Sequence, residues 1–357
     1  MSYFFRRYAR PGTSPGTLAE HETEEISQPP TIEAIVYWPG ALDREQLTDW
    51  SQLRRPGADK RLWLDISGQP DPALLERLGA VFDLHPLALE DVLNSGQRTK
   101  LDNYETHLFM VINLPGWDGR QLRLRQVSLF LGENFVISFC GDRPGLFNPV
   151  RRRLETSPNG RIRSNETDYL FYALLDLAID EGFPILEAYS EELQEIESVL
   201  VHRPGTDLLE RIHENRRELV FLKRALWSQR DAVHLLLRDD IALIRHGTRM
   251  YLRDCEDHAI QILDLVESYR DMSQALLELQ MTTISNRLND VMRVLTVIAT
   301  VFMPLSFLAA LYGMNFNTHS PWNMPELDWR FGYPVTLGVM LLIAVAMLAF
   351  FRRKRWL

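Results

Sequence analysis

The sequence lacks most of the residue patterns that mark enzymes and metal-binding modules. Its only cysteines, Cys140 and Cys255, fit no metal-binding spacing, and we expect ordinary buried or half-buried thiols in a reducing cytoplasm. It has no glycine-rich phosphate loop, no nucleophile elbow and no zinc-binding pair of histidines. We therefore expect neither an enzyme nor an organic substrate. The scattered histidines are expected to be structural: His85, His107, His202, His213 and His258.

Positive charge is scarce relative to negative charge. The 357 residues include 39 lysines and arginines against 48 aspartates and glutamates, which gives a formal net charge of -9. A domain that binds nucleic acid through its phosphates usually carries the opposite excess. The charge balance therefore argues against a nucleic-acid partner.

No long apolar run occurs before residue 294. Residues 1–16 contain arginines but no apolar core of the kind that a secretory signal requires. An organelle transit peptide is the alternative for this basic start, although glutamates follow it closely at positions 20 to 25. We expect residues 1–30 to form a disordered tail.

Two runs of membrane-spanning length lie near the C-terminus. Residues 294–311 and 332–351 contain no charged side chain and are rich in large apolar residues. A helix needs about 20 such residues to cross a bilayer. The alternative is a pair of buried core helices, which rarely lack charge on every face at this length. We predict two transmembrane helices and the lipid bilayer as a partner.

The charges beside the two spans predict their orientation. Residues 352–355 are all basic, and Arg287 and Arg293 precede the first span. The connecting loop instead carries Glu326 and Asp328 against a single arginine. Because basic flanks stay in the cytoplasm, we expect a multi-pass protein of the inner (cytoplasmic) membrane with both termini cytoplasmic and the loop external.

The sequence before residue 164 predicts a mixed α/β domain. A helix-like stripe of leucines covers residues 71–82, and a second short helix is expected after Pro86. Gly132-Glu133 is a hairpin signal between two strand-like runs, and the basic, proline-broken residues 144–163 are expected to end the domain. Strand-like composition occurs at residues 32–38, 61–66, 107–114, 126–131 and 134–139.

The remainder is expected to be helical from about Thr167. Pro204-Gly205 predicts a turn between antiparallel helices, the second of which covers residues 207–238. No glycine or proline occurs between Gly247 and Pro304, which predicts one helix over residues 249–312, on the order of 90 Å long. This helix is expected to continue from the cytoplasm into the membrane as the first span.

These patterns divide the chain into consecutive parts. The expected parts are a disordered tail (1–30), a cytoplasmic α/β domain (31–163), a helical hairpin region (164–248), a long helix (249–312) whose end is the first span (about 294–312), an external loop (313–331), the second span (332–351) and a basic cytoplasmic end (352–357).

The long helix needs partners. Its cytoplasmic part carries a stripe of apolar residues that bundling with copies of itself would bury. Two spans per subunit cannot enclose a water-filled path, so a channel requires an oligomer in which the first span lines the axis. The apolar positions are Ile262, Leu265, Val266, Tyr269, Met272, Leu276 and Leu279.

One face of the first span combines polar residues with methionines. Such residues at membrane depth usually face a bundle interior or a water-filled cavity. The alternative is that the hydroxyls bond to their own backbone and the methionines pack. We favour a pore lining, with Pro304 as a local bend and Glu278 as a ring of negative charge near the cytoplasmic mouth. The stripe comprises Asn289, Met292, Thr296, Ala299, Met303 and Ser306.

The stripe leads to a short motif at the far end of the span. Gly313, Met314 and Asn315 follow Tyr312 at the point where the helix meets external water. The carboxamide oxygen of Asn315 can accept hydrogen bonds from a hydrated cation without holding it by charge. We predict that this motif forms the mouth of a cation pathway.

Several short sequence blocks along residues 30 to 357 occur in a characteristic order. They are Tyr-Gly-Met-Asn-Phe (312–316), Met-Pro-Glu-Leu (324–327), Gly-Tyr-Pro (332–334), His-Pro-Leu-Ala-Leu-Glu-Asp-Val-Leu-Asn (85–94), Arg-Asp (253–254) and Asp-His (257–258). These blocks resemble the CorA family of magnesium/cobalt transport proteins, of the superfamily with two spans and a Gly-x-Asn motif. The first span and the basic end that closes in Trp356-Leu357 also look like that family.

The resemblance implies a funnel-shaped homopentamer with the long helix as its wall and pore. A ring of Asn315 side chains would be the selectivity filter for a cation that keeps its water shell, which suits Mg²⁺ because this ion dehydrates reluctantly. Transport would be passive and inward, with Co²⁺ as an alternative cargo.

The resemblance also implies gating by the transported ion. Regulatory Mg²⁺ would bridge neighbouring subunits between Asp91 and Asp254, with Glu90 and Asp176 nearby. Carboxylates that face each other across an interface repel when empty and are bridged when Mg²⁺ binds. The alternative is that Glu90-Asp91 flanks a helix and Asp254 is solvated.

One segment departs from the family pattern. The interval over residues 317–323 is longer than in the familiar sequence and includes His319, so Mg²⁺, Co²⁺, Ni²⁺ and the Zn²⁺ of the related ZntB branch all stay open as cargo. The Met-Pro-Glu-Leu block favours the CorA branch. A membrane-tethered sensor or scaffold is a further alternative, which the polar stripe disfavours.

Overall fold

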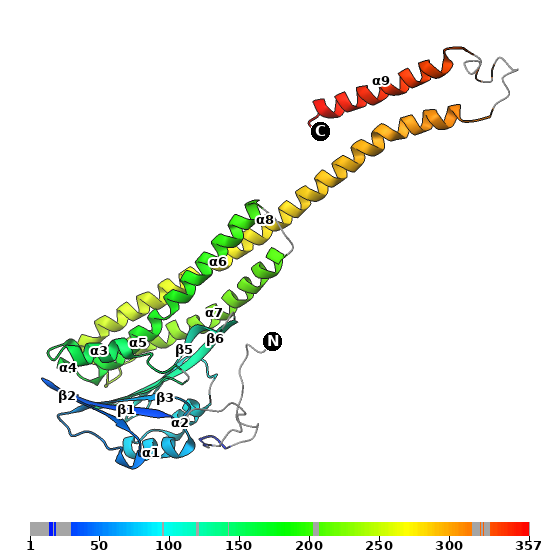
Figure 1. The fold of residues 1–357 in the computed structure, drawn as a ribbon. Helices are drawn as coiled ribbons and strands as arrows, with labels where there is room; N and C mark the ends of the chain where they lie inside the picture. Colours follow the sequence, from blue (N-terminus) through cyan, green and yellow to red (C-terminus); the bar gives the residue numbers. More distant parts are fainter. Residues whose placement is uncertain are drawn as a thin grey trace. The chain divides into compact units, whose positions relative to one another are not determined.

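The computed structural model describes residues 14–16, 18, 30–94, 96–118, 121–141, 143–202, 207–315, 322, 324 and 329–356. The chain divides into two compact units. The first joins residues up to 199 with residues 207–275, and the second joins residues 200–206 with residues 276–357. Figure 1 shows the elements in chain order.

A seven-stranded sheet lies at the centre of the first unit. The strand order is β2-β1-β3-β7-β6-β5-β4, and among the strands of the described residues only β3 and β7 pair in parallel. All five predicted strands are present. The strand bounds are β1 Thr31–Trp38, β2 Ala41–Leu47, β3 Arg61–Ser67, β4 Lys100–Asn103, β5 Leu108–Asp118, β6 Gln121–Leu131 and β7 Phe135–Phe139.

Two edge strands were not predicted from the sequence. β2 has four exposed residues in succession and little apolar content, and β4 is only four residues long. Neither shows the alternation of apolar and polar residues that marks a half-buried strand. The structure therefore adds both of them through pairing with β1 and β5 rather than through their own composition.

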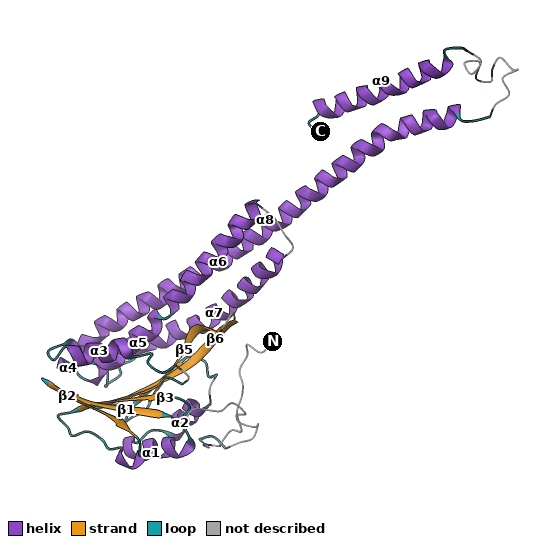
Figure 2. Cartoon of the chain, in the orientation of Figure 1, coloured by secondary structure: helices purple, strands orange, loops and turns teal. Residues whose placement is uncertain are grey.

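The sheet separates two apolar cores. Along β5, Phe109 and Val111 pack into one core, while Leu108, Met110 and Ile112 pack into the other. This alternation follows from the two-residue period of a strand. Figure 2 shows α1 (Pro72–Phe82) and α2 (Pro86–Leu93) on one face and α3 (Asn148–Thr156), α4 (Arg161–Ser164) and α5 (Thr167–Asp180) on the other.

Local capping sets the positions of α1 and α2. The Asp71 carboxylate accepts a hydrogen bond from the Leu74 amide at 2.6 Å, and Asp83, which follows the last residue of α1, has a left-handed conformation. His85 then caps α2, because its Nδ1 accepts a hydrogen bond from the Leu87 amide at 3.2 Å. Both helices predicted in this region are thus confirmed.

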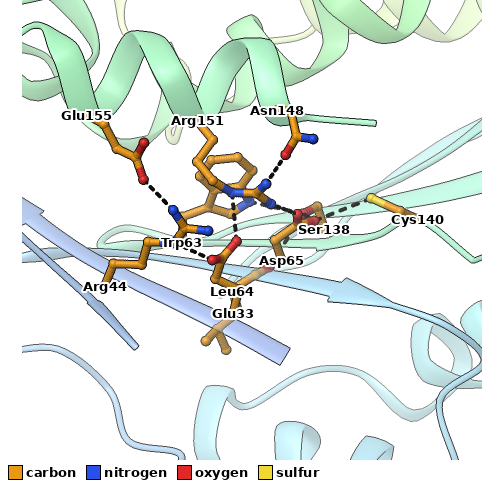
Figure 3. A network of polar contacts seen from close by, with 10 residues as sticks. All are labelled: Glu33, Arg44, Trp63, Leu64, Asp65, Ser138, Cys140, Asn148, Arg151 and Glu155. Carbon is orange, nitrogen blue, oxygen red and sulfur yellow. Dashed lines mark hydrogen bonds and ion pairs between the residues drawn. The ribbon is translucent and has the colours of Figure 1, made fainter. Parts of the chain in front are cut away.

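A buried polar network fastens α3 to the sheet (Figure 3). The Asp65 carboxylate accepts hydrogen bonds from Ser138 Oγ at 2.6 Å and from Arg151 at 2.5 Å. Arg151 also forms an ion pair with Glu33 at 2.6 Å. Burial raises the pKa of the Asp65 carboxyl and raises the pKa of the Cys140 thiol beside it, so Cys140 is a structural thiol.

Long helices complete the first unit. The predicted helix over residues 207–238 is α7 (Asp207–Arg238), and α8 (His246–Tyr312) begins three residues before the predicted position 249. The predicted single helical run from Thr167 is broken, because α6 (Gly182–His202) starts anew after α5. At Gly182 an added Cβ would lie 3.0 Å from Ile262 Cδ1, so the lack of a side chain at this residue allows α6 to approach α8 closely.

The second unit contains the C-terminal part of α8 and the whole of α9 (Gly332–Arg353). Both helices are long and apolar enough to cross a membrane. Only 11% of the apolar window of α8 and 6% of that of α9 is buried, which argues against two core helices. Val297 and Val301 of α8 pack against Phe351 of α9, with Leu305 and Met347 beside them. The start of the apolar stretch of α8 therefore contacts the end of α9.

Candidate functional site

The predicted pore stripe lies on an exposed face of α8. All six of its residues are exposed, and they recur at alternating steps of three and four. At about 100° per residue, the stripe lies on the side of the helix opposite to Val297 and Val301, which contact α9. Within the second unit, the polar stripe therefore faces away from the other membrane-length helix.

The threonine hydroxyls on this part of α8 bond to their own helix. Thr296 Oγ1 donates to the Met292 carbonyl at 2.7 Å, and Thr300 Oγ1 donates to the Thr296 carbonyl at 2.7 Å. This is the alternative that the sequence left open for the hydroxyls. Each oxygen still has an acceptor lone pair, so Thr296 can offer an oxygen to water or to a hydrated ion.

The predicted filter residues lie where α8 ends. The Gly313 amide donates to the Ala309 carbonyl at 3.0 Å, and the Met314 amide donates to the Leu311 carbonyl at 3.3 Å. Gly313, Met314 and Asn315 are all exposed. A Cβ at Gly313 would lie 3.1 Å from the Ala309 carbonyl oxygen, so the turn favours glycine. Glu326 and Asp328 lie outside the described residues, as do His319 and its neighbours.

Two of the predicted regulatory carboxylates lie on α2 and already have partners. Lys100 Nζ donates to Asp91 Oδ2 at 2.6 Å, and Glu90 Oε2 accepts a hydrogen bond from the Gly16 amide at 2.6 Å. Burial raises the pKa of the Asp91 carboxyl, and the ion pair with Lys100 opposes this increase. Gly16 belongs to the segment predicted to be a disordered tail, most of which lies outside the described residues.

The third carboxylate, Asp176, belongs to a group that could hold a divalent ion. Asp176 and Asp180 of α5 and His258 of α8 place one ligand atom each within 4.8 Å of one another. His258 Nδ1 lies 2.9 Å from Asp180 Oδ1. Burial and the neighbouring Asp180 raise the pKa of Asp176, so the group would gain from a cation. Two carboxylates and one imidazole suit several divalent metals.

Sequence reasoning missed two members of this group. Asp180 was not singled out, and His258 was expected to be structural. The four-residue spacing of Asp176 and Asp180 puts both carboxylates on one face of α5, which is a signal that the sequence did contain. The contact with His258 across 78 residues was not readable from spacing.

The fourth carboxylate, Asp254, is exposed on α8, next to the buried Cys255. Cys255 Sγ lies 3.7 Å from Asp176 Oδ1, and burial raises the pKa of this thiol. Within one chain, Asp91 is engaged by Lys100 of its own domain. The bridge between Asp91 and Asp254 of neighbouring subunits stays a prediction, as does the negative ring at the exposed Glu278.

An α/β unit built on a mixed sheet, followed by long helices and two membrane-length C-terminal helices, defines an integral membrane protein. The chain belongs to the family described as CorA-like Mg²⁺ transporter protein, whose family model matches residues 59–353. This confirms the resemblance found from the motifs. It also confirms the predicted class, because the family consists of ion transporters rather than enzymes.

Individual relatives agree with this assignment. The chain is 39% identical over 355 residues to the cobalt/magnesium transport protein CorA of Thermotoga maritima, covering 99% of each chain. It is 35% identical over 295 residues to the putative metal ion transporter YfjQ of Bacillus subtilis, covering 82% of this chain and 89% of the relative. The structure of the CorA magnesium transporter from Methanocaldococcus jannaschii shares the fold, with a TM-score of 0.76 at 19% identity over 93% of this chain and 100% of that one.

Proposed function

We propose that this chain transports hydrated Mg²⁺ across the membrane into the cytoplasm, down its electrochemical gradient. The observation that carries the proposal is the exposed stripe on α8, which lies opposite to the α9 contact and leads to Asn315. The sequence identity to a cobalt/magnesium transport protein over 99% of both chains supports the same cargo, with Co²⁺ as the alternative.

Magnesium chemistry fits a neutral filter. Mg²⁺ is small and gives up its water reluctantly, so a ring of carboxamide oxygens can hold the hydrated ion through its waters. Such a ring binds too weakly to trap a divalent cation. An inside-negative potential contributes about 2.3 kcal/mol per charge per 100 mV, and a divalent cation gains about twice that amount. Passive inward flow therefore needs no further energy source.

The proposed assembly is a homopentamer in the inner membrane, with both termini cytoplasmic. Two spans from one chain cannot enclose a path for a hydrated ion, so copies of α8 must surround the axis. The face opposite to Val297 and Val301 is the one that remains for this role. Asn289 and Glu278 then extend the path toward the cytoplasm.

Regulation by cytoplasmic Mg²⁺ is the second part of the proposal. Glu90, Asp91, Asp176 and Asp254 supply carboxylate oxygens, the ligands that hard divalent cations prefer. The proximity of Asp176, Asp180 and His258 supports a metal site on α5 and α8. Loss of the regulatory ion would remove the bridge between neighbouring subunits and loosen the closed pore.

The test is ion uptake into proteoliposomes that contain a Mg²⁺-sensitive dye, at an imposed inside-negative potential. Asn315→Ala is expected to lose uptake by at least about tenfold or to lose selectivity among divalent cations. Thr336→Val on α9, whose hydroxyl bonds to the Gly332 carbonyl, is the control and should transport normally. Wild-type protein that passes no Mg²⁺, Co²⁺, Ni²⁺ or Zn²⁺ would instead favour a membrane-tethered sensor.

A further inference from the structure

The Asp91 carboxylate forms an ion pair with a lysine side chain of the same chain. Lys100 Nζ lies 2.6 Å from Asp91 Oδ2 and 2.6 Å from Asp102 Oδ2. Lys100 and Asp102 are two residues apart on β4, so their side chains lie on the same face of the strand. Asp91 reaches this pair from α2. The ammonium is therefore shared between two carboxylates on different elements.

The surroundings hold this arrangement in place. The exposed fractions of the side chains are 27% for Lys100, 16% for Asp91 and 35% for Asp102. Lys100 Nζ lies 5.7 Å from the centre of the Phe109 ring, which is packed in the core. Partial burial strengthens each ion pair relative to a fully exposed one. The three groups together carry one net negative charge.

We propose that Lys100 is a built-in competitor for the metal at Asp91 and sets the Mg²⁺ concentration at which that site fills. This inference rests on the proposed regulatory role of Asp91. Without metal, the ammonium neutralises Asp91. When Mg²⁺ binds Asp91, Lys100 keeps its ion pair with Asp102. After this exchange both the Asp91 carboxylate and the Lys100 ammonium still have a partner of opposite charge.

Asp102 is essential to this exchange. A half-buried ammonium that lost its only carboxylate would oppose metal binding strongly, because an unpaired buried charge is costly. A second carboxylate at the same distance gives Lys100 a partner in both states. The two residues therefore have opposite effects on the site: Lys100 weakens Mg²⁺ binding, whereas Asp102 makes the release of Asp91 possible.

The test measures the Mg²⁺ concentration that gives half-maximal protection of the detergent-solubilised full chain against proteolysis. Lys100→Gln is expected to lower this concentration about fivefold. Asp102→Asn is expected to raise it, because Lys100 then depends on Asp91 alone. Each variant is first compared with wild type by thermal unfolding without Mg²⁺, so that a folding defect is recognised.

Two controls separate exchange from a general effect of charge. Arg98→Gln removes the same charge from an exposed side chain two residues away and should shift the midpoint less than Lys100→Gln. In the Lys100→Gln background, Asp102→Asn should have little further effect, because Asp102 acts through Lys100. Equal shifts for Arg98→Gln and Lys100→Gln, or additive effects of Lys100→Gln and Asp102→Asn, would overturn the inference.

A further variant distinguishes this inference from the proposal that supports it. Asp91→Asn should remove part of the Mg²⁺ protection, and that part is the response that Lys100 controls. Full protection in Asp91→Asn would mean that the regulatory role of Asp91 is wrong, and the exchange with it. Lost protection in Asp91→Asn together with an unshifted midpoint in Lys100→Gln would overturn the exchange alone.

Discussion

His107 is a single residue that couples the stability of the first unit to pH. It is buried, and Thr106 Oγ1 lies 3.0 Å from its Nδ1. Burial, and then the neighbouring His85, lowers its pKa from 6.5 to about 4. At pH values between 4 and 6.5, His107 therefore binds a proton in the unfolded chain but not in the folded chain. Stability therefore falls as the pH falls from 6.5 toward 4.

His107→Gln should reduce this acid sensitivity. We expect the variant to lose less unfolding free energy than wild type between pH 7 and pH 4.5, by about 1 to 2 kcal/mol. Thermal unfolding of the solubilised protein at the two pH values measures the difference. His213→Gln changes an exposed histidine and is the control. If wild type and His107→Gln lost the same unfolding free energy between the two pH values, His107 would not be the source of the acid sensitivity.

Arg151 is a residue whose removal should damage the fold itself. It contacts both Asp65 and Glu33, and Asp65 is 3% exposed. Arg151→Met leaves a buried carboxylate without its cation and should cost about 3 to 5 kcal/mol. The double variant Arg151→Met with Asp65→Asn should recover part of that loss in thermal unfolding. No recovery would show that the guanidinium acts mainly by packing.

At the residue scale, the sequence could suggest only those residues whose local chemistry and position were informative. Asn315 is the main example, because a carboxamide after an apolar span has few structural uses, and its role stays a prediction. Lys100 was not identified, because nothing in its local sequence shows that β4 brings it to Asp91. His258 was missed for the same reason, since the distance between α5 and α8 is a tertiary property, whereas the four-residue spacing of Asp176 and Asp180 was a local signal.

At the scale of elements, α8 presents two faces that should respond differently to mutation. Val301 packs against Phe351 of α9, whereas Met303 is exposed on the stripe. Val301→Ala should lower the thermal midpoint through about 1 kcal/mol of lost packing, with normal ion selectivity. Met303→Ala should change Mg²⁺ flux with little change in the midpoint. Mg²⁺ uptake and thermal unfolding are measured on the same samples of both variants. Altered flux in Val301→Ala with a lowered thermal midpoint in Met303→Ala would place the pore on the other face of α8.

Long elements were predictable and short ones were not. The bounds of α7 match the prediction because proline, glycine and an uninterrupted helical pattern delimit it. The break between α5 and α6 was not predicted, and the close approach of Gly182 to Ile262 is a tertiary contact that no local pattern reveals. β2 and β4 owe their structure to neighbouring strands, so their own composition gave no signal.

At the scale of the whole molecule, the proposed pore requires several copies of the chain. Native mass spectrometry of the detergent-solubilised protein should show five chains of 41.5 kDa each. The expectation that the apolar stripe of α8 is buried by other copies is not confirmed, because Ile262 and Val266 are already buried in the core of one chain. The proposed oligomer rests instead on the polar stripe, since two membrane-length helices cannot enclose a water-filled path. A monomer at all protein concentrations that still transports Mg²⁺ would rule out the shared axial pore.

The strand order has a consequence for how the protein is made. β3 pairs in parallel with β7, which brings Leu62 beside Phe135, so the sheet is incomplete until β7 has left the ribosome. Both membrane-length helices are synthesised much later. At about 5 to 20 residues per second, the sheet has several seconds to form before the first apolar helix appears. The order of synthesis thus lets the sheet fold in water before the first membrane-length helix is available for insertion into the bilayer.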